Sequence, residues 1–224
     1  MIKVIARRLL GALPNLAGVI VVTFLLTRAL PGDPAAYFAG GAATQEAVAQ
    51  VRAQLGLDKP LVEQFFRYVA DLAHGELGTS LTTGQPVLQE LITRLPASIE
   101  MVLLALTLAC AIALPLGVLA ATRPGSWIDQ LCRLVTTAGV SLPTFFTGLV
   151  LSYIFYFLLG WAPSPLGRLD PMFSPPPQVS GFYLIDAALA GDASLWWASF
   201  KQLILPTLTM AIFVLAPIAR MTRA

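Results

Sequence analysis

The side chains best suited to chemistry are few in this sequence and have no neighbours that would complete a site. The only histidine, His74, precedes Gly75, and Cys110 and Cys132 fall in or beside apolar stretches. A zinc site or a catalytic nucleophile needs further ligands or a base close by. We interpret His74 as a residue that ends a helix and the cysteines as unpaired thiols, so we expect no metal and no cofactor.

The sequence also has no GxxxxGK[ST] phosphate-binding loop, so the chain itself does not bind ATP in that way. No nucleophile with a base lies inside an apolar stretch, which disfavours an intramembrane enzyme. The remaining chemistry is that of hydroxyls and backbone beside prolines in apolar segments. Ser141 and Thr144, which flank Pro143, are the main example.

These residues must be positioned by apolar helices. Hydrophobic residues make up 57% of the chain and charged residues 12%, about half the charged share of a soluble domain. Four uncharged or nearly uncharged stretches are long enough to cross a bilayer as helices. The predicted fold is an all-α polytopic membrane protein with spans at about 9–30, 99–121, 134–159 and 203–219.

The first stretch is predicted to remain in the mature protein. It is longer than the 7–15 residues typical of a signal-peptide core, and no clear A-x-A cleavage site follows it.

The charges between the spans predict orientation. Residues 1–8, 122–133 and 220–224 carry one acid, Asp129, against seven basic residues: Lys3, Arg7, Arg8, Arg123, Arg133, Arg220 and Arg223. Short basic loops face the cytoplasm, which places both termini inside. No ionisable residue lies mid-span, and this disfavours a proton- or sodium-coupled secondary carrier. If the chain moves a solute uphill, the energy is expected from another subunit.

The two outer segments are expected to differ in structure. Residues 31–98 predict a small helical subdomain: Thr44 caps one helix, Pro60 opens a second that closes at His74, and a third runs from Pro86 to a stop at Pro96. Residues 160–200 are rich in proline and predict a shaped loop, which is either a rim around an entrance, a docking ledge or a connector. The predicted domains are therefore 1–30, 31–98 and 99–224.

Several short motifs resemble one family in order along the whole chain. They are residues 31–34 (PGDP), 55–60 (LGLDKP), 74–80 (HGELGTS), 164–168 (SPLGR), 181–186 (GFYLID), 203–206 (LILP) and 219–223 (ARMTR). The chain is similar to the first permease subunit of the dipeptide, oligopeptide, nickel and glutathione ABC importers of the bacterial inner membrane.

This resemblance implies a path for peptides or similar small solutes, shared with a second, similar permease. It also implies two cytoplasmic ATPases and an outer solute-binding protein as partners. By the same resemblance, Ser141, Pro143 and Thr144 are candidates for lining the path, although each hydroxyl is as well suited to bond its own helix. Candidate contacts with the binding protein are Asp33, Glu76 and Arg168. Candidate contacts with cytoplasmic partners are Arg220 and Arg223.

The family also has a cytoplasmic ATPase-coupling loop and two further spans, and these would follow Arg223. The chain is therefore expected to correspond to the front part of such a permease, truncated before that loop. Alternatives to a transport role are a non-transporting membrane anchor or scaffold and, less favoured, a fragment of a secondary carrier.

Overall fold

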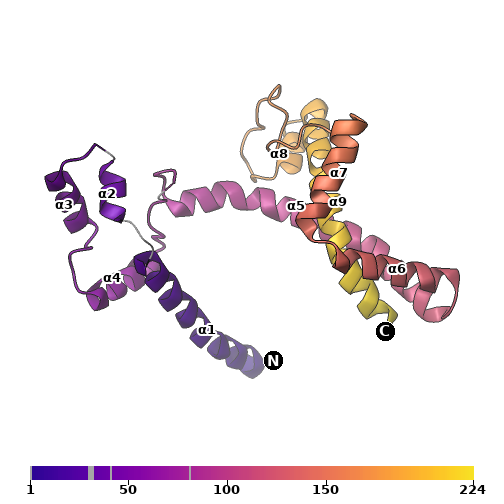
Figure 1. Ribbon diagram of the computed structural model, residues 1–224, viewed down its shortest axis with the longest axis horizontal. Coiled ribbons are helices and arrows are strands. Elements are labelled where there is room, and N and C mark those ends of the chain that lie inside the picture. Colours follow the sequence, from indigo (N-terminus) through magenta and orange to yellow (C-terminus); the bar gives the residue numbers. More distant parts are fainter. Residues whose placement is uncertain (1, 30–32, 41, 81) are drawn as a thin grey trace. The chain divides into compact units, whose positions relative to one another are not determined.

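A computed structural model describes residues 2–29, 33–40, 42–80 and 82–224 (Figure 1). Within these ranges the secondary structure is helical, and the sole β-type pairing is an isolated bridge between Thr79 and Pro86. The chain forms two compact units, Met1–Ile92 and Thr93–Ala224. We describe each unit by itself.

The first unit contains α1 (Ile2–Ala29), α2 (Pro34–Ala39), α3 (Gln45–Gln54) and α4 (Leu61–Ala73). The carboxylate of Asp33 accepts a hydrogen bond from the amide of Ala35 (3.0 Å) and so caps α2. The hydroxyl of Thr44 accepts one from the amide of Ala47 (3.3 Å) and caps α3. The predicted cap at Thr44 is therefore confirmed.

An aromatic cluster joins α4 to α1. The rings of Phe65 and Tyr68 lie 5.3 and 5.7 Å from that of Phe24, which is buried. The helix end predicted at His74 is confirmed, since His74 is the C-cap of α4. Its amide and its Nδ1 both form hydrogen bonds with the carbonyl of Ala70, the latter at 2.7 Å. Gly75 follows with φ of +84°, a conformation that favours glycine.

The second unit begins within α5 (Val87–Thr122) and continues through α6 (Trp127–Ser141), α7 (Thr144–Ser152), the π-helix η1 (Tyr153–Leu158), α8 (Tyr183–Leu189) and α9 (Ala193–Arg223). By length and composition, α1, α5 and α9 can each cross a membrane. The consecutive helices α6 and α7 pass the same test together, with a bend of 100° between them. The expected fold, a polytopic all-α membrane protein, is confirmed, with three spans or four if the bent pair counts as one.

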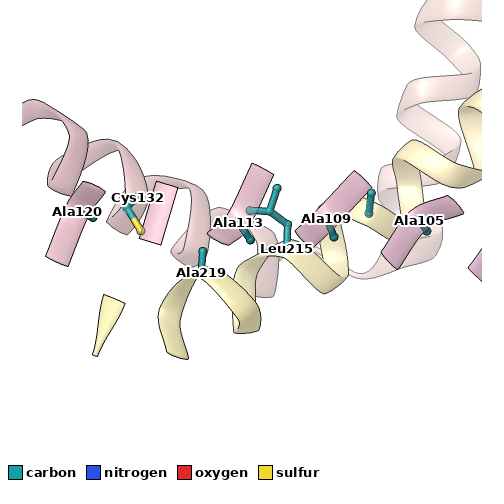
Figure 2. Close-up of a cluster of buried hydrophobic side chains, with 8 residues drawn as sticks. Ala105, Ala109, Ala113, Ala120, Cys132, Leu215 and Ala219 are labelled. Carbon is teal, nitrogen blue, oxygen red and sulfur yellow. The ribbon is translucent and has the colours of Figure 1, made fainter. Parts of the chain in front are cut away.

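A stripe of small residues forms the core of the second unit. Buried alanines recur every four residues on α5, at Ala105, Ala109 and Ala113, and pack with Leu215 and Ala219 of α9 (Figure 2). Small side chains let helix backbones approach closely, which is how helices associate where lipid removes the hydrophobic driving force. Two helical glycines lie at close approaches between helices. A Cβ on Gly117 would lie 2.6 Å from the Cβ of Thr222, and one on Gly139 would lie 2.9 Å from the Cβ of Ala216.

The second predicted span is part of a longer helix. The prediction that Pro96 ends the preceding outer helix is wrong, since α5 continues through Pro96 and Pro115. Its 36 residues extend about 54 Å, well beyond the 30 Å hydrocarbon core. An interior proline removes one backbone donor and disfavours a helix, yet α5 remains helical on both sides of each proline.

The last two predicted spans also change. The third was expected at about 134–159 as one stretch, but α6 begins at Trp127, where Ser126 caps it, and the helix breaks at Leu142–Pro143. The fourth was expected at 203–219, but α9 begins ten residues earlier because Asp192 caps it (2.9 Å from its Oδ1 to the amide nitrogen of Leu195). Trp196 and Trp197 therefore lie in the first turns of α9.

Candidate functional site

The break between α6 and α7 contains the three residues predicted to line a path. Leu142 adopts an extended conformation (φ −104°, ψ 131°), as expected for a residue before proline. Pro143 is the N-cap of α7, and its carbonyl accepts hydrogen bonds from the amides of Phe146 and Thr147. The hydroxyl of Ser141 is exposed but donates to the carbonyl of Thr137, one turn back (2.7 Å). Thr144 is half-buried at the first position of α7.

A pocket of about 300 Å³ lies in the same unit, between α5, α7, α9 and the 163–167 loop. Its walls combine apolar and polar groups, and none of the three residues at the break lines it. The lining residues are Met101, Gly148, Ser152, Pro163, Ser164, Pro165, Gly167, Lys201, Gln202, Leu205, Pro206, Thr209 and Met210. The volume is at the lower end of the range for small-molecule sites.

Gln202 joins α9 to the loop that closes this pocket. Its side chain is buried, and its Nε2 donates to the carbonyl of Ser164 (2.6 Å), with those of Leu166 and Gly167 at 3.3 Å. The proline-rich loop therefore holds its shape through backbone carbonyls fixed to a helix. This loop was expected to span residues 160–200, but α8 and the start of α9 occupy its second half.

Arg168, which follows the 163–167 loop and is half-buried, forms an ion pair with the buried carboxylate of Glu100. Glu100 is 6% exposed, and its Oε2 lies 3.1 Å from Nη2 of Arg168. The same carboxylate accepts the amides of Tyr183 (3.3 Å) and Leu184 (2.9 Å). The guanidinium lies 3.7 Å from the ring centre of Tyr183 and donates to the carbonyl of Gly181. One α5 side chain thus anchors both the loop and the start of α8.

Asp186 organises the backbone just before α8. It is 1% exposed and accepts hydrogen bonds from the amides of Val179, Ser180 and Gly181 and from the hydroxyl of Ser180. Burial raises the pKa of Asp186, but the hydrogen bonds from Ser180 and the backbone outweigh it and hold that pKa below its ordinary value. The carboxylate is therefore ionised at neutral pH.

A second buried acid connects the start of α6 to the end of α9. Asp129 of α6 is 1% exposed and forms ion pairs with Arg133 of the same helix (3.2 Å) and with Arg223 at the end of α9. It also accepts the amide of Gly125 (3.0 Å). Asp129, the only acid among the predicted cytoplasmic segments, thus holds the last turn of α9. Arg223, predicted to contact a cytoplasmic partner, is instead paired within the chain.

The other predicted contact residues lie at the surface. Asp33 forms an ion pair with Arg52 in addition to capping α2, and this hydrogen bond from Arg52 is the main reason that the pKa of Asp33 is lowered. Glu76 and Arg220 are exposed. Residues 31 and 32 of the PGDP motif lie outside the described residues.

Sequence reasoning missed Lys201, Gln202, Glu100 and Asp129 as parts of polar sites. Glu100 and Asp129 belong to no recognisable motif, and their partners Arg168 and Arg223 lie far along the chain. Lys201 falls between the predicted outer loop and the fourth span. Among the described residues, no group of three or more His, Cys, Asp or Glu side chains is placed to hold a metal ion.

Two family models cover nearly the whole chain. Residues 1–102 match the N-terminal region of the binding-protein-dependent transport system membrane component, and residues 113–224 match the binding-protein-dependent transport system inner membrane component.

Curated relatives align along almost all of the chain. It is 44% identical over 222 residues (99% of the chain) to a probable D,D-dipeptide transport system permease protein, DdpB, of Escherichia coli K12. It is 38% identical over 218 residues (97%) to the dipeptide transport system permease protein DppB of Alkalihalophilus pseudofirmus and 41% identical over 225 residues (100%) to the di/tripeptide transport system permease protein DppB of Pseudomonas aeruginosa. The chain spans 65%, 65% and 66% of the lengths of these relatives, respectively.

Proposed function

Because the chain belongs to the family of binding-protein-dependent transport system inner membrane components, we propose that it is a permease subunit of an ATP-driven peptide importer. The observation that carries this proposal is the similarity, along almost the whole of this chain, to three permeases whose names specify dipeptides or di- and tripeptides. Nickel and glutathione remain alternative solutes of the same broader family. The proposed role is transport, with ATP hydrolysis by separate subunits.

The proposed partners are a second, similar permease, two cytoplasmic ATPases and an outer solute-binding protein. The basic residues of 1–8, 122–133 and 220–224 support an orientation with both termini in the cytoplasm. In this orientation residues 31–98 form an outer subdomain, and residues 99–224 form part of the transmembrane domain.

The break between α6 and α7 is the proposed point where backbone faces the path. Irregular backbone at membrane depth is tolerated where protein or a water-filled cavity satisfies it. Of the two hydroxyls there, Thr144 is the stronger candidate, since Ser141 already donates to Thr137. Asp33, Glu76 and Arg168 remain proposed outer contacts, of which exposed Glu76 is better suited than Asp33 or Arg168, since these two are paired with Arg52 and Glu100. By the same reasoning Arg220 is better suited than Arg223 to meet a cytoplasmic partner, because Arg223 is bound to Asp129.

Uptake of a labelled dipeptide tests the function. The intact permease subunit would be produced with its genetically linked partners in a host that lacks its own peptide importers. We expect uptake that requires both this subunit and ATP. If uptake is lost when other subunits are deleted but persists without this one, the chain acts as a non-transporting scaffold. Uptake driven by an ion gradient would indicate a secondary carrier.

Cysteine labelling tests the break itself. A thiol at position 144 in a Cys110→Ala, Cys132→Ala background should react with a water-soluble reagent, and transported peptide should slow the reaction. A thiol at exposed Leu134 on α6 is the matched control. No reaction at position 144 in any nucleotide state would refute its place on the path.

A further inference from the structure

The pocket between α5, α7 and α9 has an unbalanced charge. Of the described residues that line it, Lys201 is the one with a formal charge. Its Nζ lies 5.6 Å from the ring centre of Trp197, a weak cation–π contact. The carboxylate of Glu100, next to the lining residue Met101 on α5, already binds Arg168 and two backbone amides. Lys201 is exposed, and among the described residues its ammonium has the Trp197 ring as its one partner, so it is left to bind an anion.

Two of the other polar side chains on the wall, Gln202 and Thr209, are committed. The amide nitrogen of Gln202 is held by loop carbonyls, and the hydroxyl of Thr209 donates to the carbonyl of Leu205 (2.8 Å). Both groups retain oxygens, which accept hydrogen bonds but do not attract an anion. The cation at position 201 is thus the feature that sets which ligand charge the pocket prefers.

Pro206, which also lines the pocket, changes the backbone hydrogen bonding of α9. Proline has no N–H to donate to the carbonyl one turn earlier, which here belongs to Gln202. Lys201 and Pro206 both line the pocket, so the ammonium lies close along α9 to a carbonyl that lacks its usual helical donor. This pairing is complementary to a small molecule with a carboxylate and donor groups, and the volume of about 300 Å³ suits a small solute.

From these contacts we infer that Lys201 binds the terminal carboxylate of the peptide in this pocket during its passage through the permease. The inference rests on the proposed function and adds a specificity-determining residue to it. A charge-assisted hydrogen bond of this kind is stronger than a neutral one, so peptides with a free carboxylate are preferred over their C-terminal amides at this step.

The test compares translocation of a dipeptide and its C-terminal amide by the complete importer reconstituted in vesicles. Each peptide is loaded onto the binding protein beforehand, occupancy is verified, and loaded binding protein is supplied at saturation, so that its own preference does not contribute. Lys201→Met should lower the free-acid to amide ratio of translocation rates by about tenfold or more. Lys201→Arg should largely restore the ratio.

Lys59→Met is the matched control, because it removes the same charge from the first unit, and it should leave the ratio unchanged. An unchanged ratio in Lys201→Met overturns the inference while the proposed function stands. Failure of the unaltered importer to move either peptide overturns the proposed function, and the inference with it.

A second measurement covers the case in which Lys201→Met does not assemble. Ser152 also lines the pocket, from α7 rather than α9. In the cysteine-free background with Lys201 intact, a thiol at position 152 should be protected from a water-soluble reagent by the free-acid peptide and much less by the amide. Equal protection by the two peptides would contradict a carboxylate site at Lys201.

Discussion

Gly117→Ala is predicted to loosen the contact between α5 and α9. The added Cβ would lie 2.6 Å from the Cβ of Thr222 and 3.1 Å from the carbonyl oxygen of Ala219. Carbon atoms pack at about 3.5–4.0 Å, so the two helices must separate locally by about 1 Å. The neighbouring atoms belong to a backbone and to a β-branched side chain that is bonded to the carbonyl of Ile218, and neither moves freely.

The expected cost follows from two opposing terms. Overpacking of this kind destabilises by about 1–3 kcal/mol, and alanine offsets up to about 1 kcal/mol of this through its higher helix propensity. We therefore expect a net loss of about 1–2 kcal/mol, which corresponds to a roughly 5- to 30-fold larger open population.

Cys132 reports this opening directly. It is fully buried in the cluster that contains the α5 stripe, so a maleimide reaches it only when the packing opens. In a Cys110→Ala background in detergent micelles, Gly117→Ala should raise the labelling rate of Cys132 about 5- to 30-fold.

Two controls make the experiment decisive. At Gly148 an added Cβ meets the nearest side chain at 3.4 Å, an ordinary contact, so Gly148→Ala should leave the rate nearly unchanged. Thr222→Gly combined with Gly117→Ala should recover most of the loss, since it removes the clashing Cβ. Equal labelling rates for Gly117→Ala and Gly148→Ala would refute the reasoning.

Three further predictions concern the buried acids. Arg168→Met leaves the Glu100 carboxylate buried without its cation and should cost about 3–5 kcal/mol locally, measured as faster proteolysis of the 159–182 loop; cleavage at the unaltered rate would contradict it. Because the folded pKa of Asp186 lies below its unfolded value, its stabilisation is complete above the unfolded pKa and is lost as pH falls through the folded one. Amide protection at 179–181, corrected for intrinsic exchange, should therefore hold from neutral pH to about pH 4 and decline below it, and Asp186→Asn should abolish this acid step; a decline near pH 6 would contradict the assignment. Asp129→Asn weakens the ion pair with Arg223, and faster hydrogen exchange in the last turn of α9, with no change at its first turn, is expected; uniform exchange along α9 would argue against a local tie.

The cap at Thr44, the helix end at His74 and the apolar helices could be predicted from the sequence because each depends on local chemistry. Thr44 has the residue type of an N-cap, and His74-Gly75 has the pattern of a helix end. The apolar content of α1, α5 and α9 identified them as spans. Such features need no knowledge of what packs where.

Other helix boundaries were missed, some at the local caps Ser126 and Asp192 and some where tertiary contacts decide them. Asp129 and Arg133 look like loop residues until Arg223, 90 or more positions later, is seen to neutralise the acid. Pro96 looks like a stop, and Pro143 looks like a mild kink, yet the first lies within a continuous helix and the second accompanies a 100° bend. The pocket was missed for the same reason, since four separate segments line it.

The alanine stripe of α5 has a consequence for how variation along this helix should be judged. A leucine at position 109 or 113 would raise the mean hydropathy of the segment, and a hydropathy profile would therefore score it as a better membrane span. At these fully buried positions side-chain volume is limiting, so the tolerated changes should be those to glycine or serine. Natural variants with a larger side chain there should occur only together with a smaller side chain on the facing helix.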